Sequence, residues 1–92
     1  MQSVTSGLNI TSITPNPANA KIDVSFSLSL QSSVSIFLIN MLGEKVLSIN
    51  PEIYESGLHT ITLPLANLSS GSYILRVESA GGFSDRTLNI MK

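Results

Sequence analysis

The segment LPLANLSSGSYILRV, residues 63–77, is the most informative part of the sequence about the fold of this chain. Pro64 has no N–H to donate to a neighbouring strand, and the Ser-Ser-Gly of residues 69–71 has the composition of a turn, so one strand ends here. From Tyr73 onward every second residue is apolar or aromatic, which is the pattern of a new strand with one buried face. The stretch therefore predicts a crossing from one β-sheet to another.

Within this stretch, Leu68, Gly71 and Tyr73 have a spacing that resembles the tyrosine corner of immunoglobulin-like and fibronectin-like sandwiches. In that motif the ring packs inside the sandwich and its hydroxyl bonds to the backbone upstream. A plainer interpretation is that Tyr73 is only a core aromatic residue at the start of a strand. Both interpretations predict a β-sandwich.

Alternation of apolar and polar residues predicts further strands along the chain. It is clearest from Lys21 to Leu30, where every second side chain up to and including Leu30 is large and apolar. We expect a turn at residues 31–33, a hairpin in which Gly43 takes a positive φ, and a strand break at residues 50–51. Together these patterns predict an all-β fold, an immunoglobulin-like Greek-key β-sandwich of about seven antiparallel strands.

The length and composition of the chain exclude several classes of function. The 92 residues make one domain with a single core, and no cysteine is present to form a disulfide or a thiolate metal site. Charged residues are 12% of the chain and the net charge is −1. This balance argues against a nucleic-acid partner and against binding to an anionic membrane surface.

Residues suited to catalysis or metal binding are few. His59 is the single histidine, Asp23 and Asp85 are the two aspartates, and no Gly-x-Ser-x-Gly motif provides a nucleophile. We expect His59 to lie at the rim of the sandwich. One histidine with scattered carboxylates does not make a metal site. The sequence therefore predicts no catalytic, cofactor-binding or metal-binding residues, and we expect the chain not to be an enzyme.

A candidate docking patch follows from the phase of two strands. In the strand from Val34 to Ile39 the inward row leaves Phe37 and Ile39 outside, and Ile74 lies outside in the strand that follows the corner. In an immunoglobulin-like order these strands are neighbours, so the three side chains form one apolar patch, which we name the docking patch. The alternative, in which a loop or the strand at residues 44–49 covers the patch, stays open.

Several motifs occur in a set order over roughly residues 13–92. They are a Pro-Asn-Pro-Ala turn, the alternating strand, the hairpin with its Asn-Met-Leu-Gly-Glu-Lys loop, the corner and a final lysine. Their order resembles the type A C-terminal sorting domain of the type IX secretion system, also called the Por secretion system, of Bacteroidota. The residues that match its motifs are Pro15, Asn16, Pro17, Gly43, Gly71, Tyr73 and Lys92.

The resemblance implies a non-catalytic role as an address for export. A cargo that carries such a domain crosses the inner membrane by its own leader, and in the periplasm an outer-membrane shuttle and translocon read the folded sandwich. A sortase-like cysteine protease then cuts upstream of it, and the cargo reaches the cell surface or the medium. Residues 1–12 are then a linker from the cargo with a candidate first strand, and residues 13–92 are the sorting domain.

Within that linker we expect the cut in a small polar segment, because we expect its backbone to lie outside the sheets. The segment consists of Ser3, Val4, Thr5, Ser6 and Gly7. Recognition has three candidate elements: the docking patch, the turn at residues 15–17, and the edge of the last strand, which a receptor extends by β-augmentation.

The competing prediction is an immunoglobulin-like or fibronectin-like module of a secreted enzyme or adhesin that itself binds carbohydrate or protein. Sugar sites favour exposed aromatic platforms. The chain has no tryptophan, which leaves Phe37, Tyr54 and Phe83 as candidates. The sequence favours sorting over this alternative.

Overall fold

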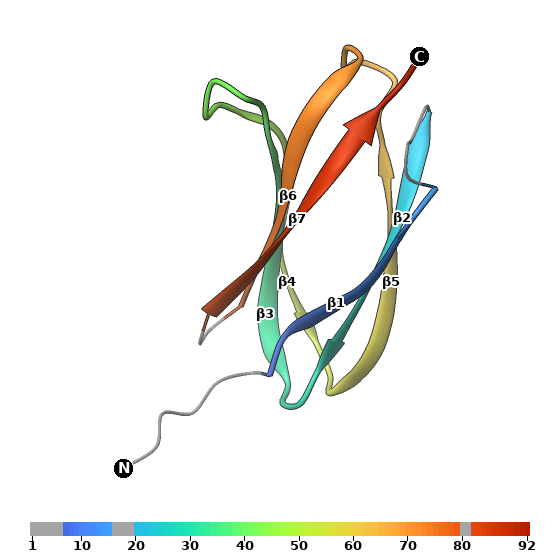
Figure 1. The fold of residues 1–92 in the computed structure, drawn as a ribbon. Coiled ribbons are helices and arrows are strands. Elements are labelled where there is room, and N and C mark those ends of the chain that lie inside the picture. The colour runs from blue at the N-terminus through green and yellow to red at the C-terminus, as the bar shows by residue number, and fades with distance from the viewer. Residues whose placement is uncertain (1–6, 16–19, 80–81) are drawn as a thin grey trace.

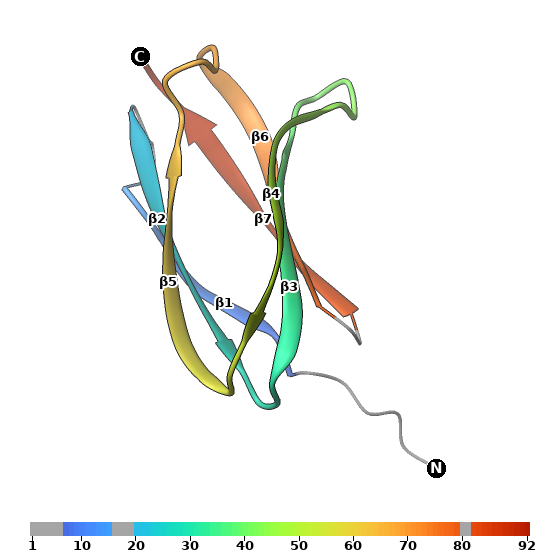
Figure 2. The same cartoon turned by 180° about the vertical axis from the view of Figure 1, so that it is seen from behind.

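The computed structural model describes residues 7–15, 20–79 and 82–92. These residues form seven β-strands and no helix. The strands are β1 (Asn9–Thr14), β2 (Lys21–Leu28), β3 (Ser32–Ile39), β4 (Lys45–Tyr54), β5 (Gly57–Pro64), β6 (Gly71–Ser79) and β7 (Gly82–Ile90). Figure 1 shows two layers of strands that face one another, and Figure 2 shows the same layers from behind.

One layer is a three-stranded sheet in the order β1-β2-β5, and the other is a four-stranded sheet in the order β4-β3-β6-β7. All neighbouring strands are antiparallel. The chain changes sheet after β2, after β4 and after β5, which is the connectivity of a Greek-key sandwich. In the described part of the chain, the predicted sandwich of seven antiparallel strands and the predicted crossing after Pro64 are both confirmed.

The core fills the space between the layers because each strand turns alternate side chains inward. Phe26 of β2 is the largest fully buried side chain, and Leu38 of β3 and Leu75 of β6 are also fully buried. The outermost strands add to the same core, with Ile10 from β1 and Ile90 from β7. Each such burial contributes about 1.5–3 kcal/mol before entropy is counted, so the two sheets hold each other in place.

The β2–β3 turn differs from the sequence prediction in two ways. Leu30, predicted to be buried, is 49% exposed because β2 ends at Leu28. Ser32 and Ser33, predicted to form part of the turn, are instead the first residues of β3. The apolar alternation continues in the sequence past the point where β2 loses its partner, since the ladder with β5 ends where Leu28 meets Gly57.

The predicted strand break at Asn50 and Pro51 is wrong, because β4 continues through both residues to Tyr54. The pairing of β3 with β4 shifts register between Val34 and Ile36 at this point, so β4 bulges instead of ending. A proline is tolerated here because β4 lies at the edge of its sheet and has a free side.

Candidate functional site

The crossing from β5 to β6 has the geometry of a tyrosine corner. The hydroxyl of Tyr73 donates a hydrogen bond of 2.7 Å to the backbone oxygen of Ser69. The ring of Tyr73 is buried, and Leu68 packs against the core from the turn. The predicted corner is therefore confirmed, and the bond fixes how the chain enters β6.

Lys92 contacts the same corner from beyond the end of β7. Its Nζ donates hydrogen bonds to the backbone oxygens of Leu65 at 2.8 Å and Ala66 at 3.0 Å. Its backbone N–H donates to Oγ of Ser70 at 2.9 Å. These hydrogen bonds bring Lys92 and Tyr73, two residues that the resemblance singled out, to the same crossover. Figure 1 shows the C-terminus and the connection from β5 to β6 at one end of the sandwich.

The β3–β4 hairpin, at the same end in Figure 1, is fixed by an asparagine and a glycine. Oδ1 of Asn40 accepts hydrogen bonds from the backbone N–H groups of Leu42 at 2.9 Å and Glu44 at 3.0 Å. Gly43 has a φ of 86°, a conformation that glycine adopts without a steric penalty, as predicted. Met41 and Leu42 at the tip of the hairpin are exposed.

The docking patch lies on the outer face of the four-stranded sheet. Ile39 of β3 is opposite Ile74 of β6, and Phe37 is opposite Arg76. All four side chains are half-buried. The predicted position of Phe37, Ile39 and Ile74 on one outer face is confirmed, and β4 lies beside β3 in the sheet instead of covering the patch. Their role in docking stays a prediction.

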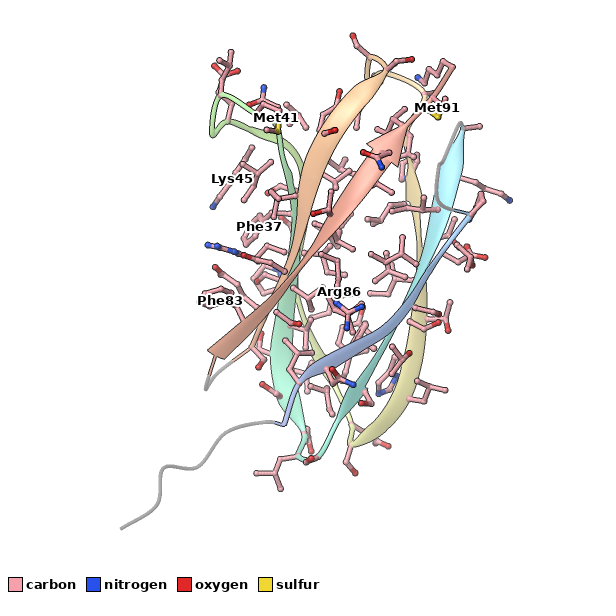
Figure 3. The ribbon with its side chains drawn as sticks, viewed as in Figure 1. Phe37, Met41, Lys45, Phe83, Arg86 and Met91 are labelled. Carbon is pink, nitrogen blue, oxygen red and sulfur yellow. The ribbon has the colours of Figure 1, made fainter. Side chains whose placement is uncertain are left out.

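Two cations lie over two aromatic rings on this face. Nζ of Lys45 is 3.9 Å from the ring centroid of Phe37, and Cζ of Arg76 is 4.3 Å from that of Phe83. Both distances are within the range of cation–π contacts. Figure 3 shows Phe37, Lys45 and Phe83 projecting from the outer side of the four-stranded sheet. One ring of the docking patch, Phe37, therefore has a positive charge above it, and so does Phe83 on the same face.

An ion pair holds one of these cations. Nε and Nη2 of Arg76 donate to the two carboxylate oxygens of Asp85 at 2.8 and 2.9 Å. This hydrogen bonding lowers the pKa of Asp85 below its usual value, although partial desolvation opposes the shift. The pKa of Arg76 is raised, again chiefly by its hydrogen bond to Asp85. Because the pair is exposed, its main effect is to orient Arg76 over Phe83.

β7 is an edge strand, as recognition by β-augmentation requires. Arg86 of this strand, however, makes a hydrogen bond across the free edge to β1. Arg86 is opposite Leu75, in the inward row of β7. Its Nη2 donates a 2.7 Å hydrogen bond to the backbone oxygen of Ile10 in β1, which joins the two sheets along this side (Figure 3). Inward-pointing charges on edge strands discourage pairing with another chain. The edge of β7 is therefore less suited to β-augmentation than the sequence implies.

The predicted turn at residues 15–17 comes directly after β1 in the chain. β1 pairs with β2 as far as Thr14, which is opposite Asp23. Pro15 follows directly and is exposed, and the peptide bond that precedes it is cis. Asn16 and Pro17 lie outside the described residues, so their predicted role stays a prediction.

The predicted cleavage segment is described only at its end. Ser3, Val4, Thr5 and Ser6 lie outside the described residues. Gly7 has a φ of 65°, and a Cβ at this position would collide with the side chain of Ser29. Gly7 therefore lies against the β2–β3 turn.

His59 is held at the rim of the sandwich by packing. Its Nε2 is 2.7 Å from the backbone oxygen of Glu55, and its ring centroid is 5.0 Å from that of Tyr54. Asp23 and Asp85 bind a threonine and an arginine instead. In the parts of the chain that the structure describes, no group of three His, Cys, Asp or Glu side chains gathers as a metal site would require.

The three candidate sugar platforms already contact other side chains. Phe37 and Phe83 carry cations over their ring faces, where a sugar ring would stack. Tyr54 packs edge-on against Phe26 with ring centroids 5.4 Å apart, and burial, followed by the negative charge and hydrogen bond of Glu52, raises the pKa of Tyr54. These contacts do not support the prediction of a carbohydrate-binding module.

Sequence reasoning missed the charged residues around the docking patch. Arg76 is in phase with Ile74, and Asp85 is opposite Arg76 in the β6–β7 pairing. Two opposite charges at matched positions of a hairpin could have predicted this pair from the sequence. Lys45 reaches its place opposite Ile39 only through a register shift in the β3–β4 hairpin. No simple alternation predicts that shift.

These features define a class of protein, a β-sandwich domain whose candidate recognition features lie on one outer face and at one end. The chain matches the family described as the secretion system C-terminal sorting domain over residues 12–91. Because this match covers most of the 92 residues, the chain belongs to that family, whose members are the C-terminal sorting signals of type IX secretion. A search of curated proteins finds no match.

Membership confirms the predicted resemblance and the predicted sorting function. The family is one of sorting signals and not of enzymes. A domain of this kind interacts with the secretion machinery, and its cargo ends at the cell surface or outside the cell. Within the described residues, no helix has the length and apolar character needed to cross a membrane.

Proposed function

We propose that the sandwich is a folded address that the secretion machinery reads in the periplasm. The cargo precedes it in the chain and crosses the inner membrane by its own leader. An outer-membrane shuttle and translocon of the type IX system then bind the sandwich, and a sortase-like cysteine protease removes it. The domain itself catalyses no reaction and uses no cofactor, and nucleic acid is not a partner.

We infer that the machinery contacts the docking patch. The observation that carries this proposal is the outer face of the four-stranded sheet, where Ile39 and Ile74 form a cross-strand pair beside Phe37. Monomeric domains keep few apolar side chains together on a surface, and such patches commonly mark binding sites. Phe83, 58% exposed, and Lys45 extend the surface on either side.

The proposed division of the chain assigns residues 1–12 to a linker from the cargo together with the start of the first strand, and residues 13–92 to the rest of the sorting domain. We propose that the protease cuts in the segment from Ser3 to Gly7. Ile10 of β1 is buried in the core, so a cut beyond it would strip a core side chain from the sandwich. The contact of Gly7 with Ser29 favours a cut before Gly7. Sequencing the N-terminus of the released fragment tests this, and a cut within β2 would refute it.

The experiment for recognition fuses residues 1–92 behind a periplasmic fluorescent protein in a host with a type IX system. Phe37→Ser should lower the surface fluorescence about tenfold, as expected when a central apolar anchor of an interface is removed. Thr60→Ala, a truncation on the opposite outer face, should leave it unchanged. Circular dichroism of each purified domain verifies that both variants are folded.

Two outcomes would sink the proposal. Unchanged export by folded Phe37→Ser would show that the docking patch is incidental. Equal loss in Phe37→Ser and Thr60→Ala would show that recognition does not distinguish the two faces. A fusion that never reaches the surface, even with the unaltered sandwich, would contradict the sorting role itself.

A further inference from the structure

Lys92 uses its charge inside the domain. Its ammonium group donates to two adjacent backbone oxygens, those of Leu65 and Ala66. These carbonyls belong to the segment that has just left β5 of the three-stranded sheet, whereas Lys92 follows β7 of the four-stranded sheet. Hydrogen bonds from an ammonium group are stronger than those between neutral groups. Lys92 therefore connects the two sheets at this end of the sandwich.

The backbone of Leu65 makes hydrogen bonds to the other segments that meet at this end of the sandwich. Its N–H donates to the backbone oxygen of Ala20 at 2.8 Å, just before β2. Its oxygen accepts both from the N–H of Leu68 at 3.0 Å and from the Lys92 ammonium. The segment before β2, the segment after β5 and the segment after β7 thus meet at Leu65. Lys92 provides the contact from the segment after β7.

A second contact from Lys92 reaches the tyrosine corner. The backbone N–H of Lys92 donates to the hydroxyl of Ser70. Ser70 follows Ser69, whose oxygen accepts the hydrogen bond from Tyr73. The end of the chain therefore holds both halves of the crossover, the part that leaves β5 and the part that enters β6.

We propose that Lys92 is a positioning residue that latches the crossover to the end of β7, so that the two form one ordered surface. In this arrangement a partner contacts the surface that the latch orders, and the ammonium group stays on the Leu65 and Ala66 oxygens. The latch itself is a property of the domain alone. Its consequence for export rests on the proposed function.

The opposite arrangement is one in which a partner binds the ammonium group directly. The two arrangements differ in a measurable way. A latch predicts that losing the ammonium loosens the amides of the crossover in the free domain. A direct contact predicts that those amides are unaffected and that only binding suffers.

The first test is amide hydrogen exchange, measured by NMR on the 92-residue chain. Lys92→Met keeps the side-chain length but removes the charge, and it should speed exchange of the Leu68 amide about tenfold, the effect of losing a charge-assisted hydrogen bond. Lys92→Arg keeps two donors and should restore protection. Lys21→Met is the matched control, because Lys21 is exposed and its side chain makes no hydrogen bond or ion pair among the described residues.

The amide of Ile36, in the centre of β3, reports whether a variant has loosened as a whole. The latch predicts faster exchange at Leu68 with unchanged exchange at Ile36. If Leu68 is as protected in Lys92→Met as in the unaltered chain, the latch is refuted. Ser70→Ala removes the hydroxyl that accepts from the backbone N–H of Lys92, so it should loosen the same crossover to a smaller extent. Full protection of the Leu68 amide in both Lys92→Met and Ser70→Ala would refute the proposal.

The second test repeats the fluorescent fusion with the Lys92 variants. The latch predicts that export falls in Lys92→Met and recovers in Lys92→Arg, in parallel with protection at Leu68. Loss of export in Lys92→Met without loss of protection would overturn the latch in favour of direct contact. Exchange in the purified domain involves no secretion machinery, so failure of the latch and failure of the sorting proposal are observed in separate experiments.

Discussion

The two outer faces of the sandwich have different chemistry, although both cover the same core. On the three-stranded sheet the outward rows carry hydroxyls that bind one another or a carboxylate. Oγ of Ser25 and Oγ1 of Thr60 are 2.9 Å apart, and Thr62 donates to Asp23 at 2.7 Å. Leu58, 67% exposed, is an apolar exception on this side. The four-stranded sheet instead turns the docking patch outward, with Lys45 over the ring of Phe37 and Arg76 over the ring of Phe83.

This difference distinguishes the inward-facing side chains, which stabilise the fold, from the outward-facing side chains, which are available for the proposed recognition. The inward rows of both sheets are mainly apolar, with Arg86 and His59 as polar exceptions, and the fold depends chiefly on the burial of these rows. The outward rows are not constrained by the core. Hydroxyl side chains on such a row can form hydrogen bonds with one another and with water. Apolar side chains gathered on an outer face do not contribute to solubility. That several such side chains gather on the four-stranded sheet, against the single Leu58 on the other face, supports the proposal that the four-stranded sheet binds the partner.

The largest expected effect concerns the core that both faces share. Phe26→Ala should lower the free energy of unfolding by about 3–5 kcal/mol, a large part of the ~5–15 kcal/mol that such a domain has. Phe26 lies in β2 and packs against Tyr54 of β4, so both sheets should lose stability together in urea denaturation followed by circular dichroism. Hydrogen exchange that shows only the three-stranded sheet loosened would contradict a single shared core.

A smaller effect is expected at the crossover that sets one face against the other. Tyr73→Phe removes the hydroxyl that donates to Ser69 and should lower the free energy of unfolding by about 1 kcal/mol, the usual contribution of one hydrogen bond. Tyr54→Phe is the control, because its hydroxyl makes a longer, exposed bond of 3.3 Å to Glu52. Equal losses in the two variants, measured by urea denaturation, would mean that the corner has no special role.

The faces themselves can be compared with two β-branched exchanges. Ile39→Thr weakens the cross-strand contact with Ile74 and should cost about 0.5–1 kcal/mol, while Thr60→Val on the hydroxyl face should change stability by no more than about 0.5 kcal/mol. Export of the fluorescent fusion should fall for Ile39→Thr alone. An equal fall for both would remove the distinction between the faces.

Much of this arrangement was predictable from local pattern. The alternation around Phe26, the turn residues before Tyr73 and the glycine in the hairpin each act through a few neighbouring residues, and each prediction is confirmed. The position of the docking patch was also predictable, since it follows from strand phase once two strands are neighbours. Its use by a partner was not, because the sequence of one chain does not show what binds it.

The failures have a common physical cause. Where β2 stops is decided by where its partner β5 begins, and Leu30 lies beyond that point however apolar it is. Pro51 continues a strand because the opposite side of β4 is free and the pairing bulges. The bonds that Arg86 and Lys92 make to distant carbonyls likewise depend on how the sheets meet. Properties set by pairing between distant strands were beyond single-sequence reasoning.

The smallest expected effect tests the charge on the outer face of the four-stranded sheet, through the ion pair of Arg76 with Asp85. The pKa of Asp85 is lowered in the folded chain by its hydrogen bond to Arg76. The pair therefore stabilises the fold fully above the ordinary carboxyl pKa of about 4, and this contribution is lost as the pH falls through the lower folded value. Asp85→Asn should reduce stability slightly at about pH 6, and the difference should shrink as the pH falls toward about pH 2 and Asp85 becomes protonated.

Thermal unfolding of both chains between these pH values measures the difference, and about 1 M salt should narrow it at the upper value because the pair is exposed. A difference that grows as the pH falls would have the wrong sign for a lowered pKa. A difference that persists in salt would mean that Asp85 acts by packing. In either case the cation over Phe83 would need another support, and the four-stranded face would differ from the hydroxyl face by its apolar side chains alone.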